Sequence, residues 1–304
     1  MIVVFGSINL DLIFPVAELP RPGHTVLGAS MTMQPGGKGA NQAVAAARDG
    51  ARVVMVGAVG RDGLAADALA LLTQAGVDMS RVARVDGATG CAAICVDAQG
   101  RNQIAVAGGA NLAVRQEQVE DALLTPDAVL LLQMEVPLSE ITALIHRARA
   151  AGARIVLNLA PAAELPPDAL RAVDLLVVNE HEAQFLADSL GCAGTARSLH
   201  AALSVDVVVT LGDAGLDAAA KTGHVALKAL PVQAVDTTAA GDCFTGVLAT
   251  ALDRGLLLDA TLARANAAAG LCCTRAGSQG SMPAADEIDA AVVGRVNQAG
   301  DDLA

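Results

Sequence analysis

The sequence predicts an α/β fold in which a mainly parallel β-sheet is covered by helices on both faces. Strand-like and helix-like segments alternate regularly from residue 115 onwards, which is the pattern of parallel strands joined by crossover helices. The strand-like segments are continuous apolar runs, and such runs indicate strands that are buried on both faces. The chain has 304 residues, of which 53% are hydrophobic, so it is long enough to bury a large core.

The first 110 residues predict the start of this sheet and a second, smaller one. Strands of the main sheet are expected at residues 2–5 and 53–59, and helices that cover it at residues 42–48 and 64–74. Other short apolar segments are expected to form antiparallel strands and, with the chain near residue 9, a small sheet outside the main alternation. These segments are residues 25–33, 82–85, 91–96 and 102–107.

The rest of the chain supplies the alternation itself. Helices are expected at residues 116–124, 138–151, 181–190, 195–203, 243–252, 258–274 and 285–296. Strands are expected at residues 128–132, 154–159, 175–178 and 205–210, followed by a hairpin of residues 216–220 and 224–230. Ligands of such sheets bind beyond the carboxyl ends of the strands, so the polar residues at those ends are the first candidates for a site.

Composition excludes several classes of partner. The net charge is −12, which disfavours nucleic-acid binding because that binding depends on Lys and Arg at the phosphates. There is no Trp or Tyr and there are four Phe, so bases cannot be stacked on aromatic platforms and an adenine pocket needs aliphatic walls. No apolar run approaches the roughly 18 residues of a membrane span.

Two further features predict a cytoplasmic protein. The first residues, Met-Ile-Val-Val-Phe-Gly, are typical of a strand and lack the charged start and cleavage site of a secretion signal. None of the six cysteines has the spacing of a zinc ligand. We therefore expect small buried hydrophobic residues in a reducing compartment.

The segment Asp236-Thr-Thr-Ala-Ala-Gly-Asp242 follows an apolar run and precedes a helix. A helix N-terminus offers unpaired N–H groups and a positive dipole end, which suit an anion. Gly241 is expected to give this turn its freedom and to let a phosphate approach the backbone. Asp242 is then a candidate base that accepts a proton from a substrate hydroxyl. The alternative is an ordinary acid in the first helical turn.

Polar or glycine-rich residues also follow the expected strands. They include Glu135, Asn158, Asn179, Glu182 and the turn from Thr210 to Gly215. Asn179 and Glu182 share one face of a first helical turn, where their oxygens suit Mg²⁺; a capping box has the same spacing. The turn at 210–215 is a candidate phosphate loop because its backbone N–H groups can point at one anion.

Residues 34–41, Gln-Pro-Gly-Gly-Lys-Gly-Ala-Asn, form a glycine-rich approach to a helix. The segment fails as a P-loop, because the positions that require Gly and Ser or Thr hold Met33 and Gly39. Lys38 and Asn41 can instead bind hydroxyl groups, and the alternative is a plain turn.

Asn9 and Asp11, two residues apart, would lie on one face of extended chain, where a surface strand is the competing interpretation.

The loop at residues 275–283, Arg-Ala-Gly-Ser-Gln-Gly-Ser-Met-Pro, is rich in backbone carbonyl groups. Such groups can coordinate a cation, although a plain linker explains the composition as well.

Four motifs now stand in one order along the chain: Gly6-Ser-Ile-Asn-Leu-Asp11, Gly36-Gly-Lys-Gly-Ala-Asn41, Asn179-Glu-His-Glu182 and Asp236-Thr-Thr-Ala-Ala-Gly-Asp242. In this combination the sequence closely resembles the ribokinase (PfkB) family of carbohydrate kinases, essentially from end to end.

The resemblance implies a three-layer α/β/α sandwich with a small β-sheet lid, in one kinase domain of residues 1–304. The lid would be built from about residues 9–34 and 82–107 and would form a homodimer contact. The resemblance also implies ATP-dependent transfer of a phosphoryl group to a sugar, with Mg²⁺ and an activating K⁺. Ribose is the favoured sugar, because the pairing of Asn9 with Asp11 and the Asn41 motif fit it.

The resemblance assigns roles residue by residue. Asp242 would be the base, with Ala240 and Gly241 as the anion hole. The sugar would be held by Asn9, Asp11, Gly37, Lys38, Asn41 and Glu135. The nucleotide site would contain Asn179, Thr210, Gly212, Asp213, Gly215 and Asn266, with Asn179 and Glu182 organising Mg²⁺. The K⁺ site would be formed by Asp236, Thr238, Cys272, Arg275, Gly277 and Ser281, several of them through carbonyl groups.

Three positions depart from the family pattern. Asn266 stands where some members have His, Cys272 is unusual, and Asp213-Ala-Gly215 replaces a more basic turn. These departures leave the type of reaction intact and bear on the substrate. The alternatives are a kinase for deoxyribose, fructose, adenosine or pseudouridine, and a non-catalytic sugar sensor on the same fold.

Overall fold

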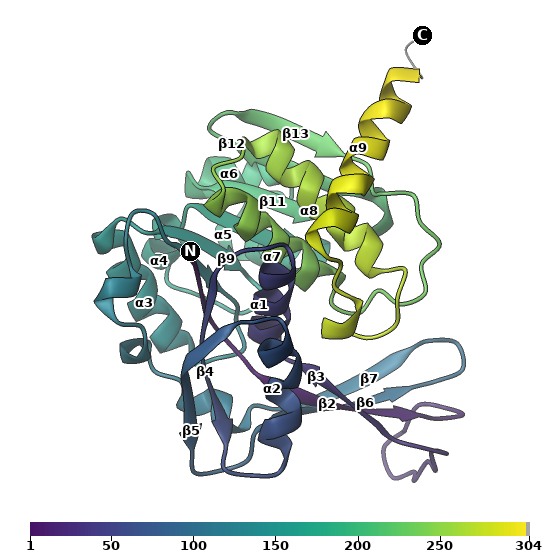
Figure 1. Cartoon of the computed structure of the whole chain (residues 1–304). Coiled ribbons are helices and arrows are strands. Elements are labelled where there is room, and N and C mark those ends of the chain that lie inside the picture. Colours follow the sequence, from purple (N-terminus) through teal and green to yellow (C-terminus); the bar gives the residue numbers. More distant parts are fainter. Residues whose placement is uncertain (302–304) are drawn as a thin grey trace.

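The computed structural model describes residues 1–301 and contains two β-sheets (Figure 1). The large sheet has nine strands in the order β13-β12-β11-β10-β9-β8-β1-β4-β5. Its strands are β1 (Ile2–Phe5), β4 (Val53–Gly60), β5 (Asp78–Val85), β8 (Val129–Leu132), β9 (Arg154–Asn158), β10 (Leu175–Asn179), β11 (Asp206–Thr210), β12 (Leu216–Ala220) and β13 (Gly223–Leu227). All neighbours pair in parallel except the last two pairs, β11–β12 and β12–β13.

Helices cover both faces of this sheet, as the sequence predicts. Strand side chains alternate between two cores, so that Val3 and Phe5 belong to one and Ile2 and Val4 to the other. The first core contains α3 (Leu138–Ala151), α4 (Pro167–Ala172), α5 (Glu180–Leu190) and α6 (Ala196–Leu203). The second contains α1 (Lys38–Arg48), α2 (Leu64–Gln74), α7 (Ala240–Asp253), α8 (Leu258–Cys272) and α9 (Ala285–Asp301). The three-layer α/β/α prediction is confirmed.

The small sheet projects from one end of this body (Figure 1). Its order is β3-β2-β6-β7, with β2 (Asn9–Pro15), β3 (Thr32–Gly36), β6 (Gly90–Val96) and β7 (Asn102–Ala107). The edge strand β7 is exposed along its length, and Ile104 and Val106 are 55% and 57% exposed. Strand β2 begins at Asn9, shortly after β1 of the large sheet ends at Phe5. The small sheet therefore starts beside the main body.

Three predictions about elements are wrong, and one helix has no prediction. Residues 82–85 belong to β5, which pairs parallel with β4 in the large sheet, because the strand–helix–strand connection through α2 favours a parallel pair. Residues 25–33 are irregular until β3 begins at Thr32, since exposed side chains such as Leu27 bury no apolar face. The helix expected at 116–124 is two short 3₁₀ turns, η2 (Gln116–Gln118) and η3 (Asp121–Leu123). Helix α4 was not predicted.

The 3₁₀ turns have a clear cause in a neighbouring helix. The Arg147 guanidinium of α3 donates to the carbonyl groups of Gln116 and Val119 at 2.7 and 2.9 Å, which satisfies them outside a helical ladder. Three more 3₁₀ turns occur, η1 (Gly109–Ala113), η4 (Gly212–Ala214) and η5 (Gln279–Ser281). Within residues 1–301, no helix is both long and apolar enough to cross a bilayer.

Candidate active site

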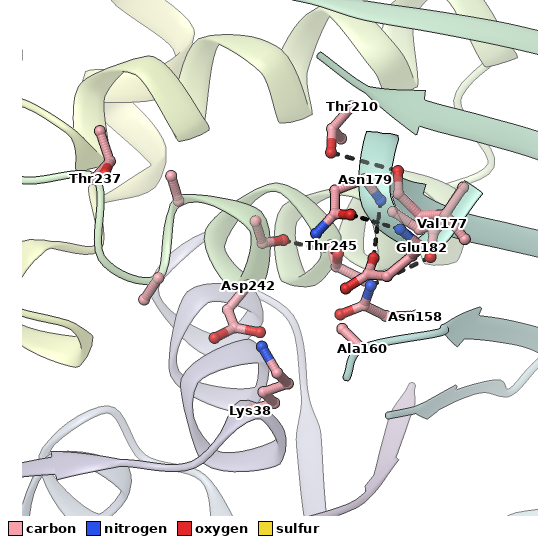
Figure 2. A pocket seen from close by; sticks show the side chains of 14 residues that line it. Lys38, Asn158, Ala160, Val177, Asn179, Glu182, Thr210, Thr237, Asp242 and Thr245 are labelled. Carbon is pink, nitrogen blue, oxygen red and sulfur yellow. Dashed lines mark hydrogen bonds between the residues drawn. The ribbon is translucent and has the colours of Figure 1, made fainter. Parts of the chain in front are cut away.

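A cavity of about 220 Å³ opens at the carboxyl edge of the large sheet (Figure 2). It is lined by Lys38, Asn158, Ala160, Val177, Val178, Asn179, Glu182, Thr210, Thr237, Ala239, Ala240, Gly241, Asp242 and Thr245. Three of the helices, α1, α5 and α7, begin at these residues. Three helix N-termini therefore border one cavity, and each contributes unpaired N–H groups and the positive end of a dipole.

The turn before α7 positions its first residues against the cavity. Ala239 has a φ of 59°, a left-handed conformation, and α7 begins directly after it. The expectation that Gly241 gives the turn its freedom is wrong, since Gly241 lies inside the helix and Ala239 makes the bend. A Cβ atom added at Gly241 would meet no atom within 4 Å. This glycine therefore leaves open space beside the helix N-terminus, where a bulky anion can approach.

Asp242 lies at the end of this cavity and is 6% exposed. Both of its carboxylate oxygens accept hydrogen bonds from side-chain amides of α1. Asn41 Nδ2 donates to Oδ2 at 2.9 Å, and Gln42 Nε2 donates to Oδ1 at 2.9 Å. The sequence analysis selected Asp242 and Asn41 but missed Gln42, whose only signal is a polar residue next to Asn41 in an Ala-rich helix.

Gln42 belongs to a buried chain of amides. Its Nε2 also donates to Asn158 Oδ1 at 3.0 Å, and its Oε1 accepts from Gln133 Nε2 at 2.7 Å. Asn158 in turn donates to the Val177 carbonyl at 3.2 Å. Gln133 and Asn158 end neighbouring strands of the sheet, so Asp242 is tied to two strands through one helix.

Lys38, the first residue of α1, points towards the Asp242 carboxylate (Figure 2). Asp242 is the main cause that raises the pKa of the Lys38 ammonium above its ordinary value, and burial opposes this. Further acids add to the effect: Glu135, Glu182 and Asp11. The lysine is thus fully protonated at neutral pH and supplies the positive charge at a cavity surrounded by carboxylates.

The predicted sugar residues come together on the side of Asp242 that faces the small sheet. Glu135 Oε2 accepts from the Lys38 backbone N–H at 3.0 Å and from Ser7 Oγ at 2.5 Å. Burial, and then the charges of Glu135 and Asp242, raise the pKa of Asp11 to about 6. This arrangement places several carboxylates where hydroxyl donors would satisfy them.

The two asparagines at this end are fixed by other side chains. Asn9 Oδ1 accepts from Asn111 Nδ2 at 2.7 Å, which leaves the Asn9 amide N–H₂ available. Asn41 uses its Nδ2 on Asp242, and among the described residues its buried Oδ1 finds no hydrogen-bond partner. Asn111 was missed from the sequence because it lies 102 residues from Asn9. One asparagine therefore presents donors to the site and the other an acceptor.

The two glycines that precede α1, Gly36 and Gly37, are explained by close contacts. A Cβ atom at Gly36 would lie 2.2 Å from Asp11 Oδ2, and one at Gly37 would lie 2.8 Å from the Asn9 backbone nitrogen. Gly37 also has a φ of 86°, which disfavours other residues. These two glycines let the loop pack directly against the polar start of β2.

At the other end, Asn179 and Glu182 form a reciprocal capping box. Asn179 Oδ1 accepts from the Glu182 N–H at 2.9 Å, and Glu182 Oε2 accepts from the Asn179 N–H at 2.8 Å. Both also line the cavity, so the cap and a ligand role are compatible. Burial is the main cause that raises the pKa of Glu182 above its usual range.

The expected nucleotide residues surround the end of β11. Thr210 lines the cavity, and Gly212 and Asp213 are exposed in the turn η4, which Gly215 closes with a φ of 105°. Asn266 lies apart from the lining residues and its Nδ2 donates to the Lys228 carbonyl at 2.7 Å. Its nucleotide role stays a prediction.

The predicted cation residues converge beneath the start of α7. Asp236 accepts from the Thr238 N–H and the Gly277 N–H, both at 2.9 Å, and so joins two loops. The Cys272 thiol lies 3.0 Å from Ser281 Oγ. The Arg275 guanidinium pairs with Glu287, which directs its positive charge to that carboxylate.

Carboxylate, hydroxyl and carbonyl oxygens of this kind are hard ligands of the type that cations prefer, and a cation role for the cluster stays a prediction. Within the described part of the chain, no group of three or more His, Cys, Asp or Glu is arranged to hold a metal ion.

Comparison with known proteins places this geometry in a family. The model of the pfkB family of carbohydrate kinases matches residues 1–285. The chain is 36% identical to a ribokinase of Haemophilus influenzae, covering 94% of this chain and 96% of the relative. It is 37% identical to a ribokinase of Bacillus subtilis, covering 95% and 98%. A structure of Arabidopsis thaliana ribokinase complexed with ribose and ATP is similar, with a TM-score of 0.86, 30% identity and coverage of 96% and 98%.

Proposed function

The chain belongs to the pfkB family of carbohydrate kinases, and we propose that it phosphorylates D-ribose with ATP to give D-ribose 5-phosphate. The observation that carries this proposal is Asp242, a buried carboxylate held by two amides at a cavity bordered by helix N-termini. Its position joins the polar residues expected for a sugar to those expected for a nucleotide. The relatives named as ribokinases, at 36% and 37% identity over nearly the whole chain, support ribose as the sugar.

The sugar is expected to lie between Asp242 and the start of β2. Asp11 and Glu135 would accept hydrogen bonds from its hydroxyl groups, and Asn9 would donate to them. The orphaned Asn41 Oδ1 would accept from another hydroxyl, which removes the cost of a buried unpaired acceptor. Asp242 would then accept the proton of the 5-hydroxyl as this oxygen attacks.

The γ-phosphoryl group would meet that oxygen in line at the N-terminus of α7. The backbone N–H groups of Ala240 and Gly241, with the helix dipole, would stabilise the charge that develops on its oxygens. Lys38 adds a positive charge beside the attacking oxygen. Such transfers depend on positioning and charge stabilisation rather than on covalent chemistry.

The nucleotide would extend from this point over the end of β11. Thr210, Gly212, Asp213 and Gly215 would contact its phosphates and ribose, and Asn266 would lie near the base. Val177 and Val178 supply aliphatic side chains to the cavity wall.

Two cations complete the proposed site. Mg²⁺ would enter with the nucleotide and neutralise phosphate charge, with Asn179 and Glu182 organising it and its waters. K⁺ would fix the loops that meet at the Asp236 carboxylate, through the oxygen atoms of Thr238, Cys272, Arg275, Gly277 and Ser281.

We also infer that the small sheet acts as a lid and as a homodimer contact. The exposed apolar residues Ile104 and Val106 support a contact at its edge strand, because exposed edges invite pairing. The whole chain would act as one kinase domain. Six free cysteines fit a reducing cytoplasm.

The decisive experiment measures ADP release with ribose, deoxyribose, fructose, adenosine and pseudouridine as acceptors. We expect the highest kcat/KM with ribose. A higher value for another acceptor would replace ribose in the proposal while retaining the kinase. Ribose binding by calorimetry without ATP turnover would identify a sugar sensor, an alternative that the buried, clamped Asp242 disfavours.

The cation proposal has a separate test. Initial rates are compared in KCl and NaCl at equal ionic strength, and we expect the faster rate in KCl. Equal rates would remove K⁺ from the proposal and leave the kinase untouched.

A further inference from the structure

Gln42 is a fully buried amide in a helix whose other inward positions are mostly small and apolar, such as Ala43, Val44 and Ala45. A buried amide costs stability unless its donors and acceptor are paired. Gln42 pairs both, since its Nε2 donates to Asp242 and Asn158 and its Oε1 accepts from Gln133. A polar residue so placed needs a reason beyond the packing of the core.

The polarity of the whole chain of amides follows from Asp242. A carboxylate only accepts hydrogen bonds, so the Gln42 amide must turn its N–H₂ group towards Oδ1. Its Oε1 then faces the opposite way and requires a donor, which Gln133 supplies. Gln133 Oε1 ends the chain of amides against Gly6, where an added Cβ atom would lie 2.0 Å from it, and among the described residues it has no hydrogen-bond partner.

Asn41 and Gln42 have different relations to the site. Asn41 holds Oδ2 and has a free acceptor for a ligand. Gln42 holds Oδ1, is 0% exposed and does not line the cavity. The terminal torsion of an Asp side chain is soft, so a donor on each oxygen is what fixes the plane of this carboxylate.

We infer that Gln42 is the positioning residue for the base: it sets the orientation of the Asp242 carboxylate so that a free lone pair faces the acceptor hydroxyl. Gln42 acts through Asp242 and touches neither substrate. The inference rests on the proposed function. It assigns Gln42 an effect on the rate of phosphoryl transfer and little effect on sugar affinity.

The test uses Gln42→Met, which keeps the length of the side chain and removes the amide. We expect kcat to fall by about 10- to 100-fold, because a displacement of about 1 Å at a reacting group costs that much, with KM for ribose and ribose affinity by calorimetry little changed. The matched control is Gln118→Met. Gln118 also makes three amide hydrogen bonds, to Gly57, Arg81 and Arg115, but on the far face of the sheet, and its loss should leave kcat unaltered.

A double-mutant cycle separates positioning from a general structural effect. In an Asp242→Asn background, Gln42→Met should lower the residual rate much less than in the wild type, since the group that it orients is gone. Equal losses in both backgrounds would overturn the inference. So would an unchanged kcat in Gln42→Met alone.

Gln42→Leu keeps the experiment decisive if the Met variant does not fold. The introduced side chain is apolar and close in size to Gln, and it cannot donate to Asp242. We expect the same loss of kcat with sugar binding retained, and a normal kcat would overturn the inference. A wild-type protein that phosphorylates no sugar refutes the proposed function instead, so the two failures are distinguishable.

Discussion

Helices α1 and α7 lie side by side (Figure 1), and both begin at the cavity. Buried carboxylates at the two ends of this pair are satisfied in opposite ways. At the cavity end, Asp242 is held by neutral amides. At the far end, Asp49 is 0% exposed and is held by the guanidinium groups of Arg254 and Arg264. Between these ends, and closer to Asp49, the Thr250 hydroxyl links the two helices by donating to the Ala46 carbonyl at 3.3 Å.

The difference teaches how a buried carboxylate is kept for chemistry. Amides fix its orientation and leave its other lone pairs for a ligand, while the nearby positive charge comes from Lys38, which points towards it without a direct ion pair. A guanidinium cancels the charge and occupies the oxygens in pairs. The first arrangement suits a base, and the second suits a link between α1, α7 and α8.

The largest expected effect is at the cavity end. Asp242→Asn keeps the shape of the side chain and removes the proton acceptor, so kcat should fall by about 10² to 10⁴. The fold and ribose affinity should persist, as measured by circular dichroism and calorimetry. Near-normal turnover in this variant would refute Asp242 as the base and, with it, the contrast between the two ends.

The far end should respond in stability and not in rate. Arg264→Met leaves the buried Asp49 with a single guanidinium, and removal of one partner of a buried pair costs about 3–5 kcal/mol in the free energy of unfolding. Urea titration measures the loss, while kcat of the folded protein should be unchanged. The control is Arg81→Met, whose exposed pair with Glu120 should contribute about 1 kcal/mol or less. A loss of kcat in a folded Arg264→Met protein would contradict the division.

Asp11 provides a third case, a carboxylate near the cavity that has neither clamp. Burial foremost, with Glu135 and Asp242, raises its pKa to about 6. Since this folded pKa lies above the ordinary value of 3.8, ionised Asp11 destabilises the protein at neutral pH, and the penalty is relieved as the pH falls from 6 towards 3.8.

Asp11→Asn should therefore raise the free energy of unfolding at pH 7.5 by on the order of 2 kcal/mol, while ribose affinity falls. Thermal unfolding and calorimetry at pH 7.5 and pH 5 check both parts, and the gain should shrink at the lower pH. An equal gain at both pH values would show that the charge of Asp11 is not its cause.

The smallest effect is expected at Thr250, whose hydroxyl links α7 to α1. Thr250→Val keeps the shape and removes a hydroxyl whose acceptors already take part in backbone hydrogen bonds, so stability should change by about 1 kcal/mol or less. Steady-state kinetics and urea titration should both resemble the wild type. A marked change in kcat would mean that the Asp242 and Asp49 ends of the helix pair are coupled through the Thr250 hydroxyl.

Sequence reasoning predicted most of the large sheet, because α3, β9, β10 and β11 have strong, local apolar patterns that survive folding. It failed where the cause is distant. Residues 116–124 do not form the expected helix, because Arg147 of helix α3 binds their carbonyl groups. Strand β5 joins the large sheet through a long-range pairing with β4.

The site divides in the same way. Asp242, Lys38 and Asn41 lie in recognisable glycine motifs, so sequence alone selected them. Gln42 gains its meaning from a hydrogen bond to a residue 200 positions away, and Asn111 from one 102 positions away. Sequence gives no reason to rank such amides above any other polar side chain.

The projecting small sheet has a practical consequence. The chain contains neither Trp nor Tyr, so it is nearly dark in the near ultraviolet. A single indole introduced at an exposed position of β7 would be the sole bright fluorophore of the protein, and its emission would follow the small sheet without background from the body. Because the protein builds its site without Trp or Tyr, such a variant would show optically whether that sheet changes position when ligands bind.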